Sequence, residues 1–237
     1  MLTVEQAREP QPVASPAPEA QAKARADLYH FFELALAHPG EGAYEYLRSV
    51  ETEAALVSCL GSLAGSGQSA GLDAAVAFFA RVRSVTFEEL EAAHISLFSS
   101  NFPVVPCPPY GSLFTVEEPK RLDEMLAIKQ FYRDIAVEMA PGFDDLPDHI
   151  CVELEVMHLL SFREAEVAGK PALLDLVLAQ QSLFLDRFML PFVDRLADIA
   201  TRHQAANPYS HLLDATRLVL AAHRAEIPDK DTQGKVS

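Results

Sequence analysis

Two pairs of side chains have the types and the spacing of a metal site. Glu91 and His94 form one Glu-x-x-His pair, and Glu155 and His158 form the other. Residues i and i+3 share one face of a helix, so each pair could present a carboxylate and an imidazole to the same ion. Two such pairs, with one further glutamate from each of two other helices, hold the metals of di-iron helical bundles.

The remaining ligands of a di-iron site would be Glu124 and either Glu33 or Glu53, in chain order. The simpler interpretation is that Glu-x-x-His arises easily in an acidic helical protein with 8 histidines. His158 would then be satisfied by a backbone or carboxylate partner. A di-iron carboxylate protein is therefore the alternative hypothesis for this chain.

A serine at residue 69 lies in a pattern that some hydrolases use for a nucleophile. The segment from Gly67 to Gly71 reads Gly-Gln-Ser-Ala-Gly. In hydrolases this pattern forms a strained turn between a strand and a helix, and no strand is predicted before it here. A linker of small residues is the better interpretation.

The apolar segment ICVELEVMHLLSF begins directly after Asp148 and His149. An aspartate in the first turn of a helix is stabilised by the helix dipole. A histidine gains nothing there as a cation, so a neutral imidazole facing a cleft is an equally good interpretation. Glu153 and Glu155 cannot both face a core, so at least one is expected to face solvent or a groove.

The stretch PCPPYGSLF, residues 106–114, lies between two segments with helical patterns. Its prolines are incompatible with a regular helix and with a central strand. Long irregular loops on helical scaffolds often carry functional residues. We therefore expect a rigid loop here that either builds a cleft or serves only as a connector.

The elements that position these residues are predicted to be helices. Apolar residues recur at intervals of three and four, as in Leu28, Phe31, Phe32 and Ala35. Few segments alternate with period two. The sequence therefore predicts an all-α fold of about nine or ten helices, including one over about 147–168 and two helices broken near Pro191.

We expect one helical domain over residues 21–226, between two flexible ends. Residues 1–20 are rich in proline and alanine, and cannot bury enough apolar area to become ordered. A second flexible tail is expected over 227–237. Inside the domain, Thr86 and Glu89 match a capping box at the start of a helix.

Charge and hydropathy narrow the classes of partner. The formal net charge of −15 repels phosphate backbones and anionic membranes, so cationic or apolar partners are favoured and nucleic acid is not expected. No leader pattern and no membrane-spanning stretch is apparent. The three cysteines give neither a metal motif nor a disulfide framework. A cytoplasmic protein is expected.

Two segments together carry a resemblance to a known family. PCPPYGSLF and PDHICVELEVMHLL resemble, in the same order, motifs of the all-helical TorD-type redox-enzyme maturation chaperones. In that family a Leu-Phe pair precedes a proline-rich loop with a Pro-Tyr-x-Ser core, and a Pro-Asp-His turn leads into an apolar helix. The resemblance extends over about residues 25–222.

The resemblance implies a non-enzymatic chaperone for the catalytic subunit of a molybdenum enzyme of the dimethyl sulfoxide reductase family. Such a chaperone binds the twin-arginine signal peptide and the body of its client in the cytoplasm until the cofactor is inserted. It needs no cofactor of its own, although transient contact with the client's molybdopterin guanine dinucleotide is compatible with this role. The residues implied to bind the client are Leu97, Phe98, Tyr110, Ser112, Asp148, His149 and Glu153.

The chain also departs from the family pattern. Gly111 stands where the family often has Glu, Phe188 where it often has His, and Phe192 where it often has Trp. His94 stands where the family often has an aromatic residue such as Tyr, which implies a lining or packing residue. These departures concern the identity of the client more than the fold.

The chemistry of a twin-arginine leader fits this chain. Guanidinium groups pair with carboxylates in fork geometry. We expect an acidic rim around an apolar groove with a floor of Leu97, Phe98 and Tyr110, and a loop that its prolines hold extended. The rim would comprise Glu117, Glu118, Asp144, Asp145 and Asp148. Both a monomer and a helix-exchanged dimer are compatible with the sequence.

Overall fold

The all-α prediction is confirmed by the computed structural model, which describes residues 17–63, 68–140, 142 and 144–229. Within these ranges the chain forms ten continuous helices and no strand. The segments are α1 (Pro18–Leu36), α2 (Glu41–Arg48), α3 (Val50–Gly61), α4 (Gln68–Arg83), α5 (Phe87–His94), π-helical η1 (Ile95–Ser99), α6 (Ser112–Thr115), 3-10-helical η2 (Glu118–Lys120), α7 (Arg121–Asp134), α8 (Ile150–Val167), α9 (Pro171–Phe184), π-helical η3 (Leu185–Met189), α10 (Leu190–Gln204) and α11 (Pro208–Glu226).

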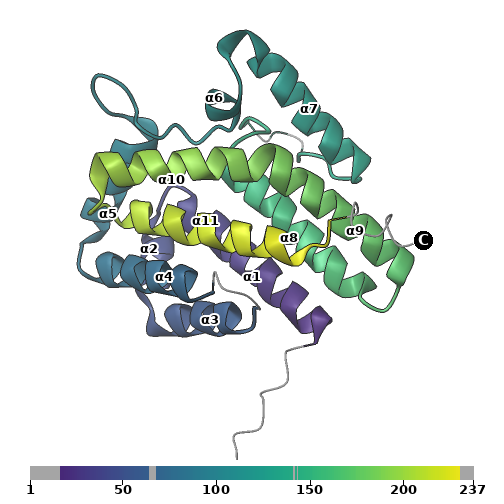
Figure 1. The fold of residues 1–237 in the computed structure, drawn as a ribbon. Helices are drawn as coiled ribbons and strands as arrows, with labels where there is room; N and C mark the ends of the chain where they lie inside the picture. The colour runs from purple at the N-terminus through teal and green to yellow at the C-terminus, as the bar shows by residue number, and fades with distance from the viewer. Residues whose placement is uncertain (1–16, 64–67, 141, 143, 230–237) are drawn as a thin grey trace, which may run out of the picture.

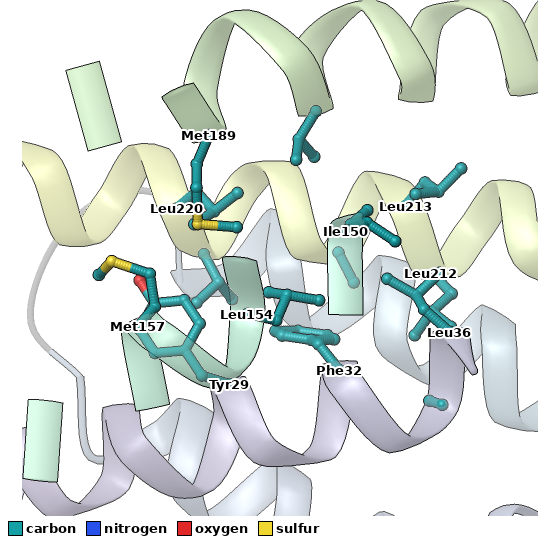
Figure 2. Close-up of a cluster of buried hydrophobic side chains, with 14 of the residues drawn as sticks. Tyr29, Phe32, Leu36, Ile150, Leu154, Met157, Met189, Leu212, Leu213 and Leu220 are labelled. Atoms are coloured by element: carbon teal, nitrogen blue, oxygen red, sulfur yellow. The ribbon is translucent and has the colours of Figure 1, made fainter. Parts of the chain in front are cut away.

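The centre of the fold is the pair formed by α1 and α8, which make the most extensive helix contact in the described chain (Figure 1). α11 packs beside α4 and α10, and α9 packs against α8. Burying one large apolar side chain contributes roughly 1.5–3 kcal/mol. The shared core is made by side chains from α1, α8, η3 and α11: Tyr29, Phe32, Leu36, Ile150, Leu154, Met157, Met189, Leu212, Leu213 and Leu220 (Figure 2).

Local signals in the sequence set several helix ends. The predicted capping box is present, because the Thr86 hydroxyl accepts from the Glu89 backbone and the Glu89 carboxylate accepts from the Thr86 backbone. The Asn207 side chain caps α11 by accepting from the Tyr209 backbone N–H. These contacts satisfy backbone donors that have no partner inside the helix.

The predicted break near Pro191 is wrong. α9, η3 and α10 form one continuous helix from Pro171 to Gln204. Pro191 lies in the first turn of α10, directly after the π-helical turn, where its missing N–H and its ring are accommodated.

This continuous helix also changes the expectation about membrane-spanning stretches. It contains an 18-residue window with a mean hydropathy of 1.2, which is long and apolar enough to cross a bilayer. Within the window 44% of the residues are buried inside the fold, and core helices can pass the same test. One such helix is weak evidence for a membrane span.

The predicted linker and tails lie largely outside the described residues. Residues 1–16, 64–67 and 230–237 are not described, and these cover most of both tails and part of the small-residue linker. α1 begins at Pro18, and α4 begins at Gln68 within the Gly-Gln-Ser-Ala-Gly pattern. A helix rather than a strand-to-helix turn therefore carries Ser69.

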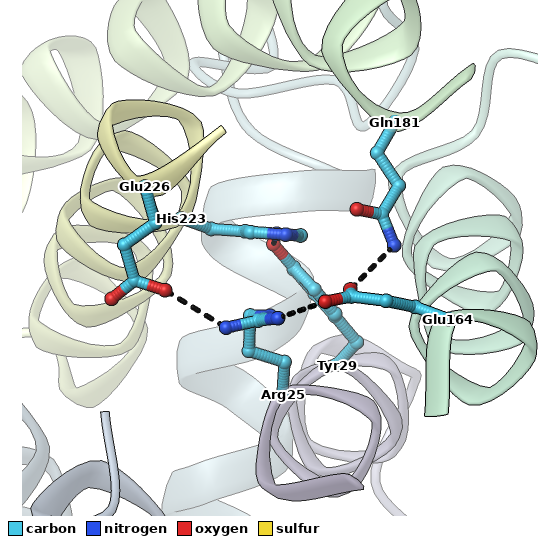
Figure 3. Close-up of polar contacts among 6 residues, drawn as sticks. All are labelled: Arg25, Tyr29, Glu164, Gln181, His223 and Glu226. Carbon is cyan, nitrogen blue, oxygen red and sulfur yellow. Dashed lines mark hydrogen bonds and ion pairs between the residues drawn. The ribbon is translucent and has the colours of Figure 1, made fainter. Parts of the chain in front are cut away.

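A buried polar network ties α1, α8, α9 and α11 together (Figure 3). The Arg25 guanidinium lies 2.5 Å from Glu164 Oε1 and 2.8 Å from Glu226 Oε2. The Gln181 amide donates to Glu164 Oε2 at 3.0 Å. Buried ion pairs are costly to break because the partner is left as an uncompensated charge. The network therefore fixes how these helices sit against one another.

The second part of the network joins α1 to α11. Tyr29 Oη lies 2.7 Å from His223 Nδ1. Burial, reinforced by the nearby Arg25, holds the pKa of His223 well below its usual range, and burial raises the pKa of Tyr29. The phenol therefore donates to a neutral imidazole.

Replacing Arg25 tests this network. Arg25→Met removes the cation that pairs with the buried Glu164 carboxylate, and we expect the free energy of unfolding to fall by about 3–5 kcal/mol. Lys23→Met is the matched control on the same helix, because Lys23 forms only an exposed pair with Glu19. Urea unfolding followed by circular dichroism measures both. Equal stability of the two variants would contradict the role given to Arg25.

Candidate functional site

The two segments that stand out in the sequence meet in the structure. Tyr110 and His149 form an isolated antiparallel bridge. The Ile150 N–H donates to the Pro109 carbonyl at 2.9 Å, and the Gly111 N–H donates to the Asp148 carbonyl at 2.8 Å. The proline-rich loop and the start of α8 are therefore one structural unit.

Buried polar contacts reinforce this unit. Asp148 Oδ2 accepts a hydrogen bond of 2.9 Å from the Ser112 backbone N–H, and the Asp148 side chain is buried. The Tyr132 hydroxyl donates to the Pro147 carbonyl at 2.7 Å. At the other end of the loop, the Cys107 N–H donates to the Leu97 carbonyl at 2.9 Å. The loop is thus held at both ends by backbone groups.

Beside this junction lies a groove of about 640 Å³. It is formed by the end of α1, the π-helical turn η1, the proline-rich loop and the start of α8. π-helical turns inside helices frequently occur at functional sites. The side chains that give the groove its chemistry are His38, His94, Phe98, Tyr110, Asp145 and His149.

The structure separates the seven predicted client-binding residues into two groups. Three of them line the groove: Phe98, Tyr110 and His149. The other four are buried and do not line the groove: Leu97, Ser112, Asp148 and Glu153. The members of the second group position the wall of the groove from behind.

His149 both caps the start of α8 and faces the groove, which were the two alternative interpretations of this residue. Its Nδ1 accepts from the Cys151 backbone N–H at 3.2 Å, which caps α8, and its Nε2 lies 3.7 Å from Asp145 Oδ2. Burial lowers the pKa of His149, while Asp145 and Asp148 oppose that shift. A neutral imidazole that uses Nδ1 as an acceptor therefore carries its proton on Nε2, next to Asp145.

Tyr110 packs edge-on against this imidazole, with ring centroids 5.3 Å apart. Burial raises the pKa of Tyr110, and the charge of Asp145 and a hydrogen bond to it raise the pKa further. The phenol therefore stays protonated near neutral pH. It gives the groove an apolar face with a hydrogen-bonding tip.

A second group of aromatic rings lies at the groove, centred on His94. The His94 ring lies 4.9 Å from Phe98, 5.1 Å from Tyr209 and 5.2 Å from His38, measured between centroids. His94 is thus a packing and lining residue, in agreement with the family resemblance. The pairing of His38 with His94 joins residues 56 positions apart, so no local pattern in the sequence indicates it.

The di-iron alternative is wrong for the described residues, where no group of three or more His, Cys, Asp or Glu side chains could hold a metal ion. His94 Nε2 lies 3.1 Å from the Leu36 carbonyl, and His158 Nδ1 lies 2.9 Å from the Ala26 carbonyl. Both imidazoles thus hydrogen-bond to α1, as the simpler interpretation expected for His158.

The glutamates expected as ligands in the di-iron alternative do not converge on one site either. Glu91 Oε1 lies 3.8 Å from His38 Nε2, and Glu124 Oε2 lies 3.6 Å from Arg187. Glu155 is exposed, whereas Glu153 is buried, so one of the two acids of this segment faces solvent, as predicted.

The acidic rim differs from the prediction in its members. Asp145 lines the groove, whereas Asp148 is turned inward toward the loop. Glu117, Glu118 and Asp144 do not line it. The prediction of an acidic edge therefore rests on Asp145, with Glu91 close to the groove through His38.

Gly111 lies where the loop passes closest to the buried Glu153. A Cβ atom at residue 111 would lie 3.0 Å from Glu153 Oε1 and 3.4 Å from Phe192 Cδ1. Burial, together with the charge of Asp148, holds the pKa of Glu153 well above its usual range. The position is therefore packed around a glycine, and a larger side chain there would have to displace Glu153 or Phe192.

Enlarging Gly111 tests this close approach. We expect Gly111→Ala to lower the free energy of unfolding by about 1–3 kcal/mol because the neighbouring side chains must shift. Gly42→Ala is the control, since Gly42 lies in a helix and has nothing within 4 Å of an added Cβ. Thermal and urea unfolding measure the difference, and equal effects would contradict the packing described for Gly111.

The lowered pKa of His94 predicts that the stability of the fold depends on pH. Burial lowers its pKa from 6.5 to about 4 in the folded chain. The unfolded chain therefore binds this proton first, and stability is lost as the pH falls from about 6.5 toward 4. Between pH 7.5 and 5.0 the loss assigned to His94 is about 2 kcal/mol.

His94→Tyr keeps the aromatic packing and removes the proton. Urea unfolding of both proteins at the two pH values isolates the effect of His94, since the other buried histidines are common to both. Identical pH dependence of the two proteins would show that His94 is not the group responsible.

Comparisons with known proteins agree with the geometry. Residues 65–198 match the family model of the nitrate reductase delta subunit, which is more than half of the chain and includes both motifs. A perchlorate reductase assembly chaperone protein from Dechloromonas aromatica (strain RCB) is 25% identical over 142 residues, which cover 60% of this chain and 63% of the relative. The matched part thus spans less than two thirds of that relative's length.

A crystal structure of a putative redox enzyme maturation protein from Archaeoglobus fulgidus also resembles this fold. It shares 21% sequence identity with a TM-score of 0.48, over 90% of this chain and 99% of the other. The family match covers the loop, the start of α8 and the helices between them. The chain therefore belongs to the nitrate reductase delta subunit family, the TorD-type family of redox-enzyme maturation chaperones.

Proposed function

We propose that this protein is a non-catalytic assembly chaperone for the catalytic subunit of a molybdenum oxidoreductase. The observation that carries the proposal is the groove beside the junction of the loop and α8, with Phe98, Tyr110 and His149 in its wall. The curated relative is by name an assembly chaperone of a reductase, which supports the same role.

The groove has the properties of a receptor for an extended peptide. The loop beside it is held at both ends by hydrogen bonds to η1 and α8, so little conformational entropy remains to be lost when a peptide docks. Tyr110 supplies aromatic surface, with the buried Phe98 packed in the wall beside it, and aromatic residues are common among those that dominate binding energy. A peptide with apolar side chains can bury them here.

The charge of the groove and of the whole chain favours a basic segment in that peptide. Asp145 lies at the groove and the net charge is −15, so a peptide carrying guanidinium groups is attracted while an acidic one is repelled. A twin-arginine leader combines two guanidinium groups with an apolar stretch. We propose such a leader, on a subunit of the dimethyl sulfoxide reductase family, as the ligand of the groove.

The proposed cellular role follows from this ligand. The chaperone acts in the cytoplasm, retains the subunit while its molybdopterin guanine dinucleotide is inserted, and then releases it. The cofactor is the client's cargo in this proposal. Both a monomer and a helix-exchanged dimer are compatible with the role.

Client capture tests the proposal. The tagged chain is purified from its host under anaerobic growth and the bound proteins are identified by mass spectrometry. We expect a molybdenum subunit with its leader uncleaved. Tyr110→Ala and His149→Ala should each reduce the recovered client at least about tenfold, which corresponds to about 1.4 kcal/mol.

Tyr46→Ala is the matched control, because Tyr46 is an exposed tyrosine on α2 outside the groove. It should recover the client as the unchanged chain does. Recovery of the client by Tyr110→Ala and His149→Ala at the control level, with both variants folded, would contradict the proposal.

A further inference from the structure

A second pocket lies along α8, beginning at Val152, directly after the groove-lining Cys151. It has a volume of about 300 Å³ and is formed by residues 137–140, which follow α7, and by the first three turns of α8. Val152, Val156 and Leu159 of α8 supply its apolar surface, and Tyr132 closes it from α7. A pocket of this size is at the lower end of those that bind ligands.

The rim of this pocket is negative. Glu138 and Glu155 both line it and both are exposed. In the part of the chain that the structure describes, neither carboxylate forms an ion pair. Arg163, one turn after Leu159, donates instead to the Ile135 carbonyl at 2.5 Å. The pocket thus offers an apolar floor beside two carboxylates that remain available to a cation.

The charge of the pocket indicates which kind of partner can bind there. A large apolar side chain fits the floor, and a basic residue next to it in the same partner would face Glu138 and Glu155. A second copy of this chain is disfavoured because each copy carries a net charge of −15. A basic and apolar peptide is therefore the fitting partner.

The position of the pocket relates it to the groove. Cys151 lines the groove and Leu159 lines the pocket. These two residues are about 12 Å apart along the helix axis, from the rise of about 1.5 Å per residue. An extended peptide covers that rise in about four residues, since each adds about 3.3 Å. Val152, which also lines the pocket, directly follows Cys151 in the chain, so the pocket begins beside the groove and one peptide can reach both sites.

We propose that this pocket is a second contact site for the client's leader, and that it binds one large apolar side chain next to a basic residue. This inference rests on the proposed function. The side chain in the pocket lies about four residues along the peptide from the part that fills the groove. The pocket thus makes the chaperone sensitive to the spacing between basic and apolar residues in the leader.

Peptide binding to the full chain tests the inference. The probe is a fluorescent synthetic peptide with two adjacent arginines, one leucine for the groove and a second leucine four residues later. A companion peptide has glycine in place of the second leucine. Fluorescence anisotropy gives the dissociation constants. We expect Leu159→Gln to weaken binding of the two-leucine peptide about fivefold to tenfold and to leave the glycine peptide unchanged.

Two matched pairs of variants separate the pocket from general effects. Leu34→Gln removes an exposed leucine of α1 outside both sites, and it should have no effect. Glu155→Gln should weaken binding about threefold at low salt and less at high salt. Glu166→Gln, which changes an exposed acid on the same helix outside the pocket, should not. Because Glu155 is exposed, its variant keeps the test valid even if Leu159→Gln fails to fold.

The outcomes distinguish this inference from the proposed function. If Tyr110→Ala weakens binding of the peptide while Leu159→Gln and Glu155→Gln match their controls, the groove binds alone and the second site is refuted. If Tyr110→Ala also has no effect, the proposed function itself fails. A dimer in sedimentation analysis that Leu159→Gln dissociates would overturn the inference, because a second copy would then fill the pocket.

Discussion

The site depends on the pairing between the proline-rich loop and the start of α8. Two backbone hydrogen bonds, from Ile150 to Pro109 and from Gly111 to Asp148, join segments that are far apart in the sequence. The buried Asp148 carboxylate adds a third contact to Ser112. Tyr110 and His149 face each other as a consequence, and the rest of the groove is arranged around them.

The helices behind the pairing supply the rigidity that a binding groove needs. His149 caps the start of α8 and Glu164 lies near its end, so the helix that starts at the groove also anchors the network of Arg25. α1 packs along α8, and its last turn, at Leu36, lines the groove. A displacement of either helix would break a buried ion pair and open the core shown in Figure 2. The groove is therefore held by elements whose positions are fixed elsewhere in the fold.

The sequence predicted the fold class and the two motifs, because apolar periodicity and proline content act locally. It could not predict which residues of each motif face the groove. Asp148 and His149 are neighbours, yet one is buried against Ser112 and the other lines the groove, and only the register of the pairing decides this. Glu153 was expected in the site and is buried beneath it, beside Gly111. His38 joins the groove through the packing of the end of α1 against the end of α5, which no local pattern encodes.

Site-specific cross-linking in the host tests the central claim most directly, because it reports contact at one residue. A photoreactive phenylalanine analogue is placed at Tyr110, or at the exposed Tyr46 as the control. After irradiation, the cross-linked peptides are identified by mass spectrometry. The account predicts that residue 110 cross-links to the leader of a molybdenum oxidoreductase subunit and that residue 46 does not. Absence of cross-links from residue 110 in cells that contain the client, or equal cross-linking from residue 46, would contradict it.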